Sequence, residues 1–136
     1  QKFQDLSAAD KLLAENAAEL RQMYGQWGGV PVDDAEAYLA TLGKRAALNA
    51  AINWYRAARD TAIDFAALPS VKVPTLYVWG TGDTTVGKMA AEGTAERVVG
   101  PFQFAQLPGV GHFVTDEAPG QFTHLLETHL SSIGTT

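Results

Sequence analysis

Two short apolar runs in the second half of the chain constrain its fold most. VPTLYVWG, residues 73–80, is β-branched and aromatic, is entered through a proline and ends at a glycine, which is typical of a buried parallel strand. FQFAQLPG, residues 102–109, predicts a second strand. Residues 87–100 and 115–130 predict a helix after each strand, the last one opened by a Thr or Asp cap with acidic residues in its first turn. This order predicts parallel strands joined by a right-handed crossover, but two strands cannot make an independent sheet.

The first 70 residues have a different period. Apolar side chains recur at helical spacing over residues 3–24, 31–44 and 45–59, and glycines or a proline separate the three segments. We therefore expect two parts, a helical segment over residues 1–70 and an α/β segment over residues 71–136.

Composition excludes several classes of function. Fifteen acidic residues against ten basic ones give a net charge of -5, and no run of Lys or Arg occurs, so we expect binding to neither nucleic acid nor membranes. The chain has no cysteine, which rules out disulfides, thiolate metal ligands and thiol catalysis. The compartment stays open on this evidence, with the cytoplasm favoured over secretion.

One acidic residue and one histidine occupy the positions where an α/β protein places its chemistry. Asp83 follows the first predicted strand in WGTGDTTVG, and His112 follows the second in LPGVGHF. If the strands are neighbours, the carboxylate can accept the imidazole Nδ1 proton and leave Nε2 as a base. The alternative is that both are ordinary turn residues, with Asp83 capping the next helix.

A phosphate-binding loop overlaps the same segment. GDTTVGK, residues 82–88, has the G-x-x-x-x-G-K spacing between a strand and a helix. Met89 stands where a hydroxyl would ligate magnesium, and no acidic residue ends the next strand, so nucleotide binding is disfavoured.

Metal binding is also disfavoured. His124 and His129 are five residues apart in a predicted helix, which separates them by about 140° around its axis, and no third ligand has suitable spacing. We expect neither a metal nor another cofactor.

Three stretches together carry a resemblance to a known family. VPTLYVWGTGDTTVG (73–87) and LPGVGHFVTDEAPGQFTHLLETHL (107–130) resemble the last two strands, the acid loop and the histidine loop of an α/β-hydrolase of the epoxide hydrolase-like branch. LNAAINWYRA (48–57) is similar to the lid helix whose tyrosine faces the active site in that branch. The resemblance implies a C-terminal portion of the fold, with a helical lid segment followed by strand, helix, strand and helix of a mostly parallel sheet.

The same resemblance implies roles for particular residues. His112 would be the base, Asp83 its orienting acid, and Tyr55 a hydrogen-bond donor to an opening epoxide. No G-x-S-x-G elbow occurs in the chain, so the nucleophile, Ser or Asp, would lie on a separate N-terminal portion of the same hydrolase. Trp54, Tyr38 and Phe113 are candidates to contact a small apolar epoxide or ester.

Several alternatives stay open. In a serine esterase or lipase-like enzyme, His112 would take the proton of a Ser hydroxyl and Tyr55 would only pack. Tyr55, Trp54 and Tyr38 lie at helical spacing, where aromatic residues often belong to the core. The remaining alternatives are a non-catalytic relative of the family and a small α+β binding module, either of which would bind a ligand or partner.

Overall fold

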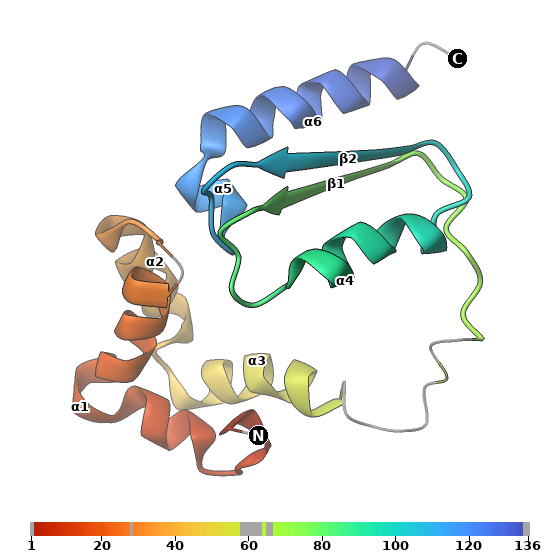
Figure 1. Cartoon of the computed structure of the whole chain (residues 1–136). Helices are drawn as coiled ribbons and strands as arrows, with labels where there is room; N and C mark the ends of the chain where they lie inside the picture. Colours follow the sequence, from red (N-terminus) through yellow and green to blue (C-terminus); the bar gives the residue numbers. More distant parts are fainter. Residues whose placement is uncertain (1, 28, 58–63, 65–66, 135–136) are drawn as a thin grey trace. The chain divides into compact units, whose positions relative to one another are not determined.

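The computed structural model describes residues 2–27, 29–57, 64 and 67–134. The chain forms two compact units, Gln1–Leu68 and Pro69–Thr136, and each is considered by itself. The first unit is helical, and the second contains the two strands (Figure 1).

The described residues of the first unit form three α-helices: α1 (Ala8–Gln22), α2 (Val32–Leu42) and α3 (Arg45–Ala57). A 3-10 turn (Lys2–Gln4) precedes α1, and a π-helical turn (Met23–Trp27) follows it. The predicted end of the third helix, at residue 59, lies outside the described residues. The helices share one cluster of buried apolar side chains, namely Ala8, Ala9, Leu12, Ala17, Leu20, Leu39, Leu48 and Ile52.

The apolar period over residues 3–24 predicts one continuous helix, but the first helix is interrupted. Its middle contains a left-handed turn, with φ of 51° at Glu15, 56° at Asn16 and 58° at Ala17. Asn tolerates this conformation better than most residues, and the Arg21 Nε donates to the Asn16 carbonyl oxygen at 3.0 Å. Ala17, the last residue of this turn, and Leu20, which follows it, are both buried in the shared cluster. The part of α1 that contains and follows the turn is therefore packed into the core in spite of its non-helical backbone.

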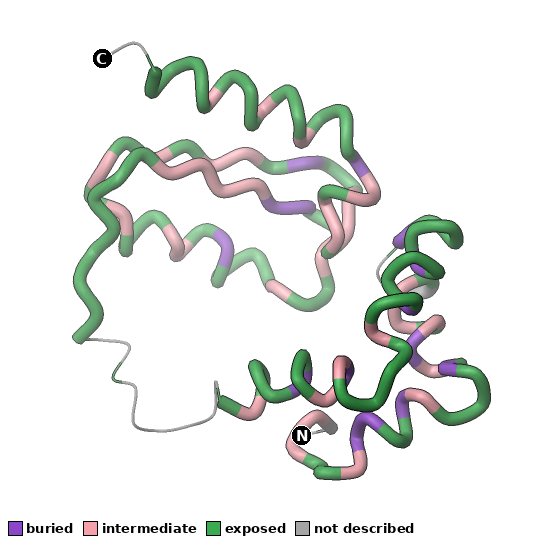
Figure 2. The backbone as a smooth tube through the Cα atoms, turned by 180° about the vertical axis from the view of Figure 1, so that it is seen from behind, coloured by how far each residue is buried: buried purple, intermediate pink, exposed green. Residues whose placement is uncertain are grey.

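The second unit is built on a two-stranded parallel sheet, as predicted. Strand β1 (Thr75–Gly80) pairs with β2 (Phe102–Leu107) in a register that runs from Thr75 opposite Phe102 to Gly80 opposite Leu107. Helix α4 (Lys88–Gly93) and a 3-10 turn (Thr94–Arg97) connect the strands. Helices α4 and α6 lie on opposite sides of the sheet (Figures 1 and 2).

The last predicted helix is divided in two. Helix α5 (Val114–Glu117) is a single turn, and α6 (Pro119–Ile133) begins after Ala118, whose φ of -138° is not helical. The cause is Pro119, because a proline disfavours helical geometry in the residue before it and is well accommodated as the first residue of a new helix. Glu117 therefore ends a short helix instead of lying in the first turn of a long one.

Burial in the second unit concentrates near the carboxyl ends of the strands. Trp79 and Leu107, at those ends, are each 5% exposed. Figure 2 shows the buried stretch of each strand in purple. In contrast, α6 has no buried residue, and its apolar Leu126, Leu130 and Ile133 are exposed. Within the part of the chain that the structure describes, no helix has the length and hydropathy needed to cross a membrane.

Candidate active site

The loop after β1 holds the carboxylate of Asp83 in one orientation. The Oδ1 atom of Asp83 accepts hydrogen bonds from the backbone N–H groups of Thr85 (2.7 Å) and Val86 (3.0 Å). The Trp79 indole Nε1 donates to the Val86 carbonyl oxygen at 2.9 Å. A buried indole at the strand end therefore anchors the turn that Asp83 closes, and the second carboxylate oxygen is left to face outward from that turn.

The loop after β2 lies against the acid loop through backbone hydrogen bonds. The Thr81 hydroxyl accepts the Gly109 N–H at 2.8 Å, and the Gly82 N–H donates to the Val110 carbonyl oxygen at 2.9 Å. Gly109 has a φ of +75°, a conformation that favours glycine. These bonds fix the two loops relative to each other, as expected for loops that leave adjacent parallel strands.

The two loops bring His112 and Asp83 together. The His112 Nδ1 lies 2.9 Å from the Asp83 Oδ2, within the range of a hydrogen bond. The Asp83 side chain is 5% exposed, whereas that of His112 is 38% exposed. Among the described residues, none hydrogen-bonds the His112 Nε2, so the carboxylate is enclosed and the outer face of the imidazole is accessible.

Electrostatics favour an ionised carboxylate at this site. Burial raises the pKa of Asp83, but the hydrogen bonds from His112, Val86 and Thr85 stabilise the charged form and leave its pKa below the ordinary value of 3.8. An ionised carboxylate can only accept hydrogen bonds, so the proton between the two side chains is assigned to the His112 Nδ1. A neutral imidazole in this tautomer presents the Nε2 lone pair, which is the arrangement of a general base.

Glu117 is a further polar residue of this site. It was not singled out from the sequence, because it fell in the acidic first turn of a predicted helix. Its Oε2 accepts the backbone N–H of Gly111 at 2.8 Å. Its Oε1 is buried and has no hydrogen-bond partner among the described residues. The only sequence signal was an acidic residue five positions after His112, which a favourable interaction with the helix dipole explains equally well.

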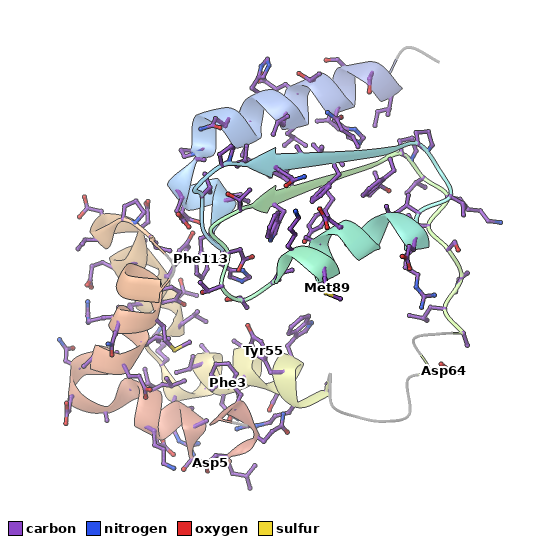
Figure 3. The ribbon with its side chains drawn as sticks, in the orientation of Figure 1. Phe3, Asp5, Tyr55, Asp64, Met89 and Phe113 are labelled. Carbon is purple, nitrogen blue, oxygen red and sulfur yellow. The ribbon has the colours of Figure 1, made fainter. Side chains whose placement is uncertain are left out.

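Tyr55 lies on α3 in the helical unit and is not a core residue there. Its side chain is half exposed, and its ring contacts those of Phe3 (centroid distance 4.8 Å) and Trp54 (5.1 Å), as Figure 3 shows for Phe3 and Tyr55. None of the hydrogen bonds among the described residues involves its hydroxyl.

Arg56, the next residue, links α3 to the N-terminal segment. Its guanidinium donates to four oxygens at 2.7–3.0 Å, the backbone carbonyls of Phe3 and Asp5 and the side chains of Asn49 and Asn53. The Gln4 side chain also donates to the Tyr55 carbonyl oxygen at 3.2 Å. The segment that carries Phe3 is thereby held against the helix that carries Tyr55.

The three candidate substrate contacts have different surroundings. Trp54 is 72% exposed and Tyr38 is 38% exposed, so neither is enclosed in the core of the helical unit. The Tyr38 ring contacts that of Tyr24 at 5.5 Å. Phe113 is half buried and meets the His112 ring edge-on at 5.3 Å. Of the three, Phe113 is therefore the one that the structure places beside the histidine.

No group of three or more His, Asp or Glu side chains within the described ranges is arranged to hold a metal ion. The chemistry that the arrangement of Asp83 and His112 offers is proton transfer, with an imidazole that is oriented by a carboxylate and open on its other side.

Comparisons with known proteins point in one direction. No protein-family model matches the chain. Epoxide hydrolase A of Mycobacterium tuberculosis (strain ATCC 25618 / H37Rv) is 26% identical in an alignment that covers 95% of this chain and 42% of that protein. The crystal structure of epoxide hydrolase A from Mycobacterium thermoresistibile is similar with a TM-score of 0.80 and 23% identity, over 95% of this chain and 50% of the other.

A second solved structure agrees. It is a mutant of an epoxide hydrolase from Bacillus megaterium in complex with its product, a naphthyloxy-propane-1,2-diol, and it has a TM-score of 0.71 and 18% identity over 95% of this chain and 49% of that one. The chain thus spans half or less of the length of these relatives.

Proposed function

We propose that this chain, an epoxide hydrolase-like C-terminal portion of the α/β-hydrolase fold, supplies the acid and the base of a catalytic triad. The acid is Asp83 and the base is His112. The observation that carries the proposal is the 2.9 Å contact between the Asp83 Oδ2 and the His112 Nδ1, with the other imidazole nitrogen accessible. The nucleophile belongs to an N-terminal portion of the same hydrolase.

The reaction is the hydrolysis of a small apolar epoxide, in two steps. First, a carboxylate oxygen of the nucleophile forms a bond to an epoxide carbon, the ring C–O bond breaks, and the released oxygen takes the proton of Tyr55. Second, His112 takes a proton from water, and the hydroxide attacks the carbonyl carbon of the ester. The ester C–O bond breaks, and the diol oxygen that leaves takes the proton from His112. The carboxylic acid that forms loses its proton and Tyr55 regains one, so the net change is addition of water.

Exposed apolar surface on the second unit supports an N-terminal portion as the partner. Each strand pairs only with the other among the described residues, and two strands are too few for independent stability. Leu126, Leu130 and Ile133 of α6 are exposed, and a folded protein ordinarily covers such a group of apolar side chains. We propose that a strand of the N-terminal portion pairs with the free edge of β1. Mass spectrometry would detect that portion as a second polypeptide or as part of a longer chain.

A variant of the histidine tests the function in the intact enzyme. In His112→Gln, the nucleophile can still open an epoxide, but water is no longer activated. We expect one equivalent of epoxide per enzyme to be consumed, together with an intact-mass increase equal to the mass of the epoxide. The variant His124→Gln, on the exposed side of α6, is the matched control and should turn over normally.

Other outcomes identify the other functions. A serine nucleophile depends on His112 for its first step, so turnover of an ester by the wild type, with no adduct in His112→Gln, would replace the epoxide proposal with a serine esterase. An intact wild-type protein that hydrolyses neither an epoxide nor an ester would indicate a non-catalytic binding protein.

A further inference from the structure

Glu117 and the backbone before His112 are in unusually close contact. The Glu117 Oε2 accepts the Gly111 N–H at 2.8 Å. A Cβ atom added to Gly111 would lie 2.6 Å from the Glu117 Oε1, so the carboxylate packs directly on the backbone, and a side chain at Gly111 would displace it. The peptide that leads into His112 is therefore held by a carboxylate on one side.

The backbone of Glu117 is bonded to the other end of the histidine loop. The backbone N–H of Glu117 donates to the Phe113 carbonyl oxygen at 2.9 Å, within the single turn of α5. Glu117 thus bonds to the residue before His112 through its side chain and to the residue after it through its backbone. His112 lies inside a closed loop of hydrogen bonds.

Enclosure distinguishes this carboxylate from a surface charge. The Glu117 Oε1 is buried and has no hydrogen-bond partner among the described residues. A buried acceptor without a hydrogen-bond partner lowers stability, so stability alone does not explain an acidic residue at this position. Fixing the backbone next to a base is such an explanation, because catalysis depends on the base being held in one orientation.

We propose that Glu117 is a positioning residue, which holds the Gly111–His112 peptide so that the imidazole Nδ1 meets Asp83. The consequence for catalysis rests on the function proposed above, but the consequence for the His112–Asp83 hydrogen bond does not. Removal of the carboxylate frees the peptide, the imidazole samples other orientations, and the hydrogen bond to Asp83 is populated for less of the time.

The test compares three variants of the intact enzyme by NMR of the His112 Nδ1 proton and by steady-state kinetics. In Glu117→Ala, we expect the resonance to broaden or vanish through exchange with water, and kcat to fall by about 10- to 100-fold with little change in KM. Glu117→Gln keeps an oxygen that can accept the Gly111 N–H and should restore most of both. Glu127→Gln removes the same charge from an exposed position of α6 and should resemble the wild type.

The NMR readout separates this proposal from the proposed function. If the protein hydrolyses no substrate, loss of the Nδ1 resonance in Glu117→Ala still supports the positioning role. A folded Glu117→Ala protein with an unchanged resonance would overturn it. If that variant does not fold, hydrogen exchange of the wild type decides: the Gly111 amide should be protected, and exchange at the rate of an open loop would equally overturn the role.

Discussion

Gly80 and Val110 approach so closely that no other residue fits at the end of β1. A Cβ atom at Gly80 would lie 2.2 Å from the Val110 carbonyl oxygen, and 2.4 Å from that of Gly111. Both contacts are to the backbone of the histidine loop, which cannot move aside as a flexible side chain can. The short distance between Asp83 and His112 therefore depends on glycine at position 80, at the end of β1.

The variant Gly80→Ala tests this dependence. The added methyl group must push the histidine loop away from the strand, and we expect the free energy of unfolding to fall by about 1–3 kcal/mol. The His112–Asp83 hydrogen bond should weaken at the same time, because the displaced segment leads into His112. Urea unfolding and the Nδ1 proton resonance measure the two effects. Gly87→Ala, at a glycine with no atom within 4 Å of the added Cβ, is the control.

The variant Asp83→Asn tests the role of the acid. The Asn oxygen can still accept the N–H groups of Thr85 and Val86, so the loop should keep its shape. The Asn amide, however, presents a donor to the His112 Nδ1, which favours the tautomer with the proton on Nε2. We expect kcat to fall on the order of 10³- to 10⁴-fold. A loss of less than about tenfold would show that the imidazole does not need this carboxylate.

The lowered pKa of Asp83 predicts a pH dependence of stability. Because the folded-state pKa lies below the ordinary 3.8, Asp83 stabilises the fold fully above that pH and loses this contribution as the pH falls through its folded-state pKa. Asp5 and Asp10 also have a lowered pKa, through hydrogen bonds from Lys11 and Arg45. Urea unfolding over a pH series should therefore show a smaller acid-side loss in Asp83→Asn than in the wild type, and parallel curves would contradict the shift.

Local patterns were sufficient to predict the strands and the paired side chains. The apolar runs marked β1 and β2, and the parallel order placed their carboxyl ends together, which is why Asp83 and His112 could be paired without a structure. The helices α2 and α3 followed from apolar spacing in the same way. Each of these inferences depends on neighbours in sequence or on the geometry of one parallel pair.

Features that depend on particular tertiary contacts were not predictable in this way. The left-handed turn in α1 involves the Arg21 side chain and a shared core, neither of which alters the apolar period of the helix. Glu117 contacts Gly111, six residues earlier, and the short helix that carries Glu117 ends at a break at Ala118. Pro119 causes this break. A proline is also compatible with the first turn of a helix, so its position did not exclude one continuous helix over residues 115–130.

The variant Arg56→Lys tests how the segment beside Tyr55 is held. Lysine keeps the charge, but a single ammonium group cannot replace a planar fork that reaches four oxygens. We expect the free energy of unfolding to fall by about 1–3 kcal/mol. Arg97→Lys, at an exposed arginine, should change it by less than about 0.5 kcal/mol. Equal stability of the two variants would mean that the Arg56 hydrogen bonds contribute no net stability.

The variant Tyr55→Phe separates epoxide opening from ester cleavage. Phenylalanine keeps the ring contacts with Phe3 and Trp54 and removes only the phenolic donor. If that donor assists the opening of the epoxide, the single-turnover rate of ring opening should fall on the order of 10- to 1000-fold, while a matched ester is hardly affected. A change of less than about twofold with the epoxide, beside efficient ester turnover, would leave Tyr55 as a packing residue and favour the serine esterase.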